Sequence, residues 1–306
     1  MDKTIFTVSD YVKIVSEINS TLIRNGADKN ETLLFRGQSS NTYELLPALG
    51  RERRAACQIS IFNEERNMIE MAKYKLPDVF NDTLSPIELI ALLQHHGIPT
   101  RLLDVTENAL VALYFACCEN NDKDAEVFAF KHNEMDITNY PIINAVADSY
   151  RFSRGTFCTL DLFYGAVIEQ PYFIEQKQSH AICHPTKESG GRWIEECCSS
   201  PLFVYAPIRS FRQQIQRGRY ILFPNRIADY GTDTETRCFE TVIDPISKDH
   251  ECIAEIINVP KENKQAILKE LMLFGISEET LFGDNTDIVC KNIKESFKSK
   301  IKGDRS

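Results

Sequence analysis

The chain has 306 residues, of which 43% are hydrophobic and 26% charged, and its formal net charge at pH 7 is −9. This composition is typical of a folded globular protein, and it excludes a disordered tail, a collagen-like fibre and a small disulfide-stapled domain. The acidic balance gives no overall attraction for nucleic acid or anionic lipid. Nucleic acid is therefore expected to bind only through a local basic patch.

The first half of the chain shows the apolar spacing of regular elements. Helices are predicted over Thr7–Leu22, over Ile59–Lys75, from Ser85-Pro86 to about His96, and over Thr106–Ala116; buried strands are predicted at Leu33–Gly37 and Ala125–Phe130.

The second half begins with a less regular segment, about residues 133–200, which we interpret as an insertion within a single domain spanning 1–306. After it, strands are predicted at Leu202–Tyr205, Tyr220–Pro224 and Glu251–Val259, and helices at Pro260–Phe274 and Thr286–Ile301. Strands and helices mix without strict βαβ alternation, which favours an α+β fold with a mixed central sheet and flanking helices.

The ends and the cysteines indicate a cytoplasmic protein. The N-terminus lacks an apolar run of signal-peptide length, and no segment approaches the roughly 20 apolar residues that span a bilayer, so we expect no membrane partner. The ten cysteines form no Cys-x-x-Cys pair. In a reducing compartment they are expected to be free thiols that act as small hydrophobes, and no metal site is predicted.

The densest polar cluster within apolar sequence runs from Gln94 to Asp104 and contains His95, His96 and Arg101. Its structural interpretation is a turn in which Arg101 pairs with Asp104 and the histidines are partly buried. Its functional interpretation is a catalytic turn, because polar groups this dense are costly to bury.

A second cluster, Phe35-Arg36-Gly37-Gln38, ends a predicted strand with an arginine. Arginine cannot lose its charge and needs an anionic partner. That partner is either a core carboxylate such as Asp104 or the phosphate or carboxylate of a ligand.

A third cluster, from Arg212 to Tyr220, places Gln216 and Gly218 between cationic residues just before a strand. It is either a solvated basic turn or a local anion site. The phosphate-loop, dinucleotide-fold, Gly-x-Ser-x-Gly and zincin signatures are absent, which argues against the common enzymes that carry them.

These clusters, in this order, resemble the FRG domain, which is named for its Phe-Arg-Gly motif. The resemblance spans about residues 20–295 and is carried by Phe35-Arg36-Gly37-Gln38, the block Gln94–Asp104, Thr106, Asn108, Ala112–Ala116, Arg212 and Gln216-x-Gly218-x-Tyr220.

The aromatic-Arg-Gly motif also resembles the first motif of ADP-ribosyltransferases, in which the arginine holds the NAD phosphates. This likeness implies that Arg36, with Arg101 and Arg212, contacts NAD, and that Gln38 and Gln216 bond nicotinamide or ribose. Gly218 stands where that fold carries its catalytic glutamate. Asp104 or Glu240 would then substitute, or His95 or His96 would do the acid–base work.

The resemblances imply an ADP-ribosyltransferase-like enzyme that uses NAD, modifies an unknown macromolecular acceptor, and serves bacterial anti-phage defence or acts as a toxin. The alternative is a non-catalytic sensor that binds a nucleotide, another small anion or a phage protein. A third hypothesis is a metal-dependent hydrolase using His95, His96 and Asp104. An active site requires that Arg36, His95, His96, Arg101 and Gln216 line one cleft.

Overall fold

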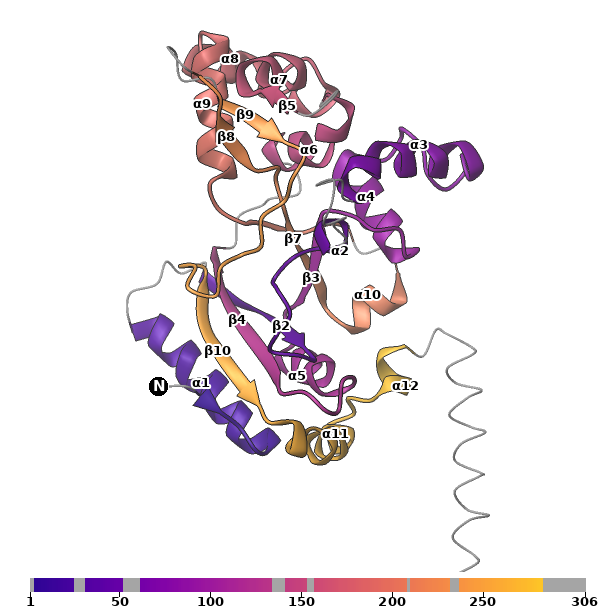
Figure 1. The fold of residues 1–306 in the computed structure, drawn as a ribbon, viewed down its shortest axis with the longest axis vertical. Helices are drawn as coiled ribbons and strands as arrows, with labels where there is room; N and C mark the ends of the chain where they lie inside the picture. Colours follow the sequence, from indigo (N-terminus) through magenta and orange to yellow (C-terminus); the bar gives the residue numbers. More distant parts are fainter. Residues whose placement is uncertain are drawn as a thin grey trace, which may run out of the picture.

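The computed structural model describes residues 3–24, 31–51, 61–133, 141–152, 157–207, 210–231 and 237–282; the helix predicted at Thr286–Ile301 lies outside them. Within these residues a seven-stranded, mostly antiparallel sheet has the order β1-β10-β4-β2-β3-β7-β6, and a three-stranded sheet has the order β5-β9-β8 (Figure 1). The strands are β1 (Lys3–Thr4), β2 (Glu31–Gln38), β3 (Leu102–Thr106), β4 (Ala125–Asn133), β5 (Phe157–Thr159), β6 (Leu202–Val204), β7 (Gly218–Leu222), β8 (Ile227–Asp229), β9 (Arg237–Glu240) and β10 (Ile253–Val259). The expected mixed sheet with flanking helices is confirmed.

The helices of the described residues cover the large sheet and build a separate helical region. They are α1 (Val8–Arg24), α2 (Ala48–Arg51), α3 (Glu65–Lys75), α4 (Pro86–His95), α5 (Ala109–Cys117), α6 (Pro141–Ala147), α7 (Leu160–Val167), α8 (Lys177–Cys183), α9 (Lys187–Cys198), α10 (Phe211–Ile215), α11 (Lys264–Leu273) and α12 (Glu278–Leu281). None of them is long and apolar enough to cross a membrane.

The two faces of the large sheet are buried in separate cores, as the alternation of side chains along a strand requires. Phe35 and Val127 pack with α1, α5 and α11 on one face. Leu34 and Phe128 pack on the other face with Leu49 of α2. Figure 1 shows α7, α8 and α9 gathered with the small sheet at the other end of the molecule.

The segment at 133–200 is more regular than predicted, because it contains four helices, α6 to α9. Every residue of α6 is buried. A short helix buried all round has no polar face, so its sequence carries no helical periodicity.

The chain at 102–106 was interpreted as part of a turn leading into a helix, and this is wrong. It forms β3, which pairs with β2 and with β7 in the centre of the sheet. The following helix, α5, begins at Ala109, and the Asn108 side chain accepts hydrogen bonds from the amides of Leu110 and Val111. Both faces of β3 are largely buried, and such a strand lacks the alternation that distinguishes it from an apolar helix.

Strand β2 lies directly against the backbone of α5 at Gly37. A Cβ atom there would lie 1.9 Å from the carbonyl oxygen of Ala112 and 2.6 Å from the amide nitrogen of Ala116. Only glycine allows this approach, which sets the position of the neighbouring Arg36 and Gln38 against α5.

The fully buried Lys264 holds the ends of β2 and α5 together. Its ammonium donates to the carbonyl oxygens of Ser39, Glu119 and Asn120 at 2.8, 3.1 and 2.9 Å. Burial lowers the pKa of this ammonium. Three carbonyl acceptors replace the water that the charge has lost, and they fix the loop on which Glu119 lies.

Replacing Gly37 with alanine is expected to destabilise the fold by about 3 kcal/mol or more, because the new methyl group overlaps backbone atoms that cannot move separately from α5. Urea unfolding measures the effect. Gly97→Ala is a useful comparison, since a Cβ at Gly97 meets no atom within 4 Å. This variant is expected to lose stability only because alanine is strained at the positive φ of 82°. Equal, small decreases in the free energy of unfolding for both variants would contradict the close contact of β2 and α5 at Gly37.

Candidate functional site

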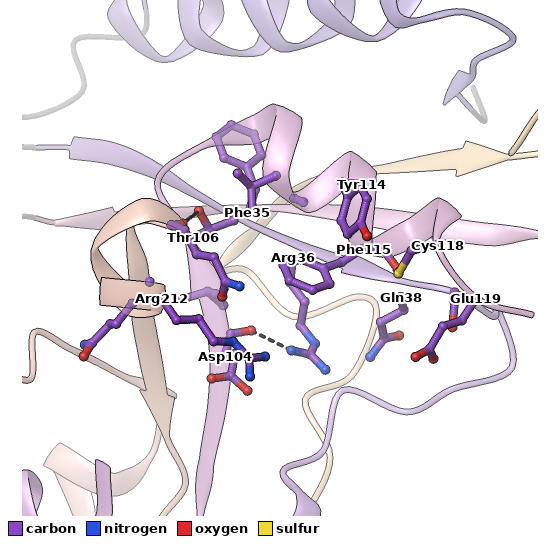
Figure 2. A pocket seen from close by; sticks show the side chains of 18 of the residues that line it. Phe35, Arg36, Gln38, Asp104, Thr106, Tyr114, Phe115, Cys118, Glu119 and Arg212 are labelled. Atoms are coloured by element: carbon purple, nitrogen blue, oxygen red, sulfur yellow. Dashed lines mark hydrogen bonds between the residues drawn. The ribbon is translucent and has the colours of Figure 1, made fainter. Parts of the chain in front are cut away.

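A cavity of about 1470 Å³ lies where the end of β2 meets β3, α5, α10 and α12 (Figure 2). Six of the residues predicted for a functional site line it, and they come from four separate segments of the chain: Arg36, Gln38, His95, Asp104, Arg212 and Gln216. The structure therefore brings Arg36, one histidine of the turn and Gln216 to one cavity.

Arg36 extends from β2 into this cavity. Its Nη1 donates to the backbone carbonyl of Asp104 at 2.6 Å, as Figure 2 shows, and its buried Nε has no hydrogen-bond partner. Within the described residues no carboxylate forms an ion pair with it, so the interpretation that the Asp104 carboxylate neutralises Arg36 is wrong. The pKa of Arg36 is lowered to about 10, mainly by burial; the charge of Asp104 opposes this shift and the charge of Arg51 contributes to it. A bound anion would restore the favourable environment that burial removes.

Gln38 follows Arg36 at the end of β2 and is only 4% exposed. Its amide nitrogen donates to the carbonyl of Glu44 at 3.2 Å. This bond fixes the orientation of the amide, and its buried Oε1 has no donor among the described residues. The side chain is therefore held as an unused hydrogen-bond acceptor at the cavity wall.

Asp104 is the one exposed residue of β3 and contributes a carboxylate to the cavity. Gln94 orients it: the amide nitrogen donates to Asp104 Oδ1 at 2.9 Å, while the amide oxygen accepts the hydroxyl of Thr100. His95, the last residue of α4, is exposed and lines the same cavity. A fixed carboxylate and an imidazole thus line the same cavity.

The wall opposite β2 is formed by α10 and α12, which are tied together. The exposed Arg212 lies over the ring of Phe282 at 4.5 Å, a cation–π contact. The amide nitrogen of Gln216 donates to the carbonyl of Leu281 at 3.2 Å. Within the described residues Arg212 forms no ion pair, so its charge is available to an anion.

Arg101 does not line the cavity, and the prediction that it pairs with Asp104 is wrong. Its side chain is 1% exposed and forms a bidentate ion pair with Glu65 of α3, and its Nη1 donates to Asn225 at 3.1 Å. Residues three apart along an extended chain point to opposite faces, so Arg101 and Asp104 cannot meet. The ion pair also leaves Arg101 no role in contacting NAD.

His96 also lies outside the cavity. It is the C-cap residue that follows α4, is exposed, and packs edge-on against Phe80 at a ring-centroid distance of 5.7 Å. The expectation of partly buried histidines is wrong for both His95 and His96. Adjacent residues on a helix point about 100° apart, which is why only His95 faces the cavity.

Residues 31–125 match the family model of the FRG domain. The chain contains an FRG domain. No curated protein and no solved structure matches the chain. The matched segment runs from β2 to the start of β4, so the FRG match includes Arg36, Gln38, His95 and Asp104, whereas Arg212 and Gln216 reach the same cavity from outside it.

The cavity of this FRG-domain protein contains charged and aromatic residues that the sequence analysis did not select. Among them are Arg51, Tyr114, Glu119 and Glu278, and the thiol of Cys118 lies beside them at the cavity. Tyr114 and Cys118 are four residues apart at the end of α5, which places them on one helical face and is a signal that could have been used. Arg51 and Glu278 lie in short helices with no local pattern that marks a site.

The eight cysteines of the described residues are free, as predicted. One of them, Cys118, lines the cavity. Burial, and then Glu119, raise its pKa to about 11, so it is a poor nucleophile at neutral pH. Within the described ranges no three His, Cys, Asp or Glu side chains are placed to hold a metal ion, and His95, His96 and Asp104 do not form such a set.

The buried Arg101 and the half-buried Arg36 are expected to respond differently to truncation. Arg101→Ala leaves Glu65 buried without its partner and should cost about 3–5 kcal/mol of stability. Arg36→Ala removes one bond to a carbonyl and a poorly satisfied charge, and should change stability by less than about 1 kcal/mol. Urea unfolding of both variants, with the exposed Glu70→Gln as control, tests this. A large loss in Arg36→Ala would identify Arg36 as a structural residue.

Proposed function

We propose that this cavity binds NAD and that the protein is an ADP-ribosyltransferase-like enzyme. The observation that carries the proposal is Arg36, a half-buried guanidinium at a large cavity, whose buried Nε has no hydrogen-bond partner and which forms no ion pair with a described carboxylate. A dinucleotide supplies the missing anion through its pyrophosphate, which the planar guanidinium can bind with two parallel hydrogen bonds.

Two more arginines support an anionic ligand. Arg51 and Arg212 line the same cavity, and neither forms an ion pair with the described carboxylates. In a chain of net charge −9, three unneutralised arginines at one cavity are a local site for a small polyanion. These three arginines lie at one cavity, which suits a nucleotide better than a nucleic-acid strand.

Asp104 and His95 are suited to the transfer step. The bond between ribose C1′ and the nicotinamide nitrogen breaks, and its electron pair leaves with nicotinamide. The Asp104 carboxylate, held by Gln94, stabilises the positive charge that develops on the ribose. A nucleophile of the acceptor then bonds to C1′ and releases its proton to His95. Glu240 is not available for this step, because it pairs with Arg226 beside the small sheet.

A second candidate is a non-catalytic sensor with the same nucleotide site. Gly218, which lines the cavity, favours the sensor, because ADP-ribosyltransferases carry a catalytic glutamate at the position that Gly218 occupies in the resemblance. The sensor would use Arg36 and Arg212 to bind the nucleotide without reacting. A role in anti-phage defence or as a toxin, and the identity of the acceptor, stay predictions from the resemblance.

The test combines binding and transfer. Calorimetry with NAD should show binding that falls by tenfold or more in Arg36→Ala, which corresponds to about 1.4 kcal/mol. Asp104→Asn should retain NAD binding while losing label transfer from adenylate-labelled NAD to a cell lysate. Arg192→Ala, an exposed arginine of α9, is the matched control.

Three outcomes separate the candidates. Label on a protein or nucleic acid, together with nicotinamide release, supports the enzyme. NAD binding that depends on Arg36, with neither label nor nicotinamide released, supports the sensor. If NAD binds equally to wild type and Arg36→Ala, or does not bind, the proposal fails.

A further inference from the structure

The cavity carries opposite charges on different elements. Arg36, Arg51 and Arg212 come from β2, α2 and α10. Glu119 follows α5, and Glu278 opens α12. Within the described residues none of these five side chains forms an ion pair. Charges of both signs that line one cavity without neutralising each other indicate a ligand site with two ends.

The acidic end is centred on the last turn of α5. Burial raises the pKa of the Tyr114 phenol, and the charges of Cys118, Glu278 and Glu119 raise it further. The same two glutamates act on Cys118. Both carboxylates line the cavity together with Tyr114 and Cys118, where they create a local negative potential.

Aromatic rings complete this end of the cavity. Phe115 packs edge-on against Tyr114 at a centroid distance of 5.6 Å and against Phe282 at 6.1 Å. All three side chains line the cavity. Aromatic faces beside carboxylates attract organic cations through both the ring quadrupole and the charge.

Gln38 adds an independent observation. Its buried Oε1 has no donor among the described residues, and its orientation is fixed by the bond to Glu44. In Figure 2 the side chain lies between Arg36 and Glu119 and extends in the same direction as both. An acceptor without a donor at this place calls for a ligand that brings an N–H group.

We propose that the end of the cavity formed by Tyr114, Glu119, Glu278 and Gln38 is a subsite for a flat organic cation that carries N–H donors. Two sources share this chemistry: the guanidinium of an acceptor molecule and the ring with carboxamide of a nicotinamide. The proposal deepens the proposed function, on which it rests, by assigning the arginines to phosphate and the glutamates to the cation.

The experiment measures binding of agmatine, 1-methylnicotinamide and inorganic pyrophosphate by ligand-observed NMR at low salt. Both cations represent the proposed chemistry, and pyrophosphate represents the anionic end. The double variant Glu119→Gln, Glu278→Gln should lower affinity for the preferred cation by about tenfold or more, since it removes both charges but keeps their size. Pyrophosphate should bind the double variant at least as well as wild type.

Glu279→Gln is the matched control, because Glu279 is exposed on the same helix, α12, and does not line the cavity. Gln38→Leu should also weaken cation binding, by removing the acceptor without changing charge. Preference for agmatine identifies the subsite as that of an acceptor guanidinium. Preference for 1-methylnicotinamide identifies it as that of the nicotinamide ring.

The proposal is overturned if neither cation binds, or if the double variant binds the preferred cation as wild type does. Failure here is distinguishable from failure of the proposed function. Cation binding that depends on the two glutamates, without NAD binding or label transfer, would support the cation subsite and contradict the proposed enzymatic function. Label transfer that depends on Arg36, without cation binding, would support the proposed enzymatic function and contradict the cation subsite.

Discussion

Close contact between the backbones of β2 and α5 at Gly37 sets the geometry of the cavity. Because no side chain separates them, Arg36 and Gln38 lie beside the last turn of α5, where Tyr114 and Glu119 are found. Lys264 then ties the end of each element to α11 through carbonyl oxygens. The two ends of the cavity are therefore held on rigid elements, which is the condition for a preorganised site.

Arg36 and Arg101 show how one residue type serves two purposes in a fold. Arg101 is buried with Glu65, a partner from the same chain, and so fastens α3 to the start of β3. Arg36 is half-buried and donates to a single backbone carbonyl, and its buried Nε has no hydrogen-bond partner among the described residues. Burial of a charge costs stability unless it is paired. The fold gives Arg101 an anionic partner, Glu65. At Arg36 we propose that a ligand supplies the anion.

Charge separation within the cavity connects the acidic composition with the proposed ligand. The net charge of −9 describes the whole surface and does not indicate where the arginines gather. Three of them line the cavity beside Asp104 and three glutamates, and they form no ion pair with these carboxylates. A ligand with a phosphate end and a cationic end would neutralise both sets at once, which neither a simple anion nor a simple cation can do.

Local patterns in the sequence determined most of the helices and strands, the Ser85 cap of α4 and the Phe35–Gln38 and Gln94–Asp104 clusters, because spacing and capping depend on neighbouring residues. The sequence also indicated six residues of the cavity. Only the tertiary structure decided that Arg101 forms an ion pair with Glu65, that residues 102–106 form a strand, and that His96 does not line the cavity. It alone brought Glu119 and Glu278 beside Tyr114. Partners in these contacts are separated by up to 164 residues, from Tyr114 to Glu278, and side chains that meet only after folding leave no local pattern to read.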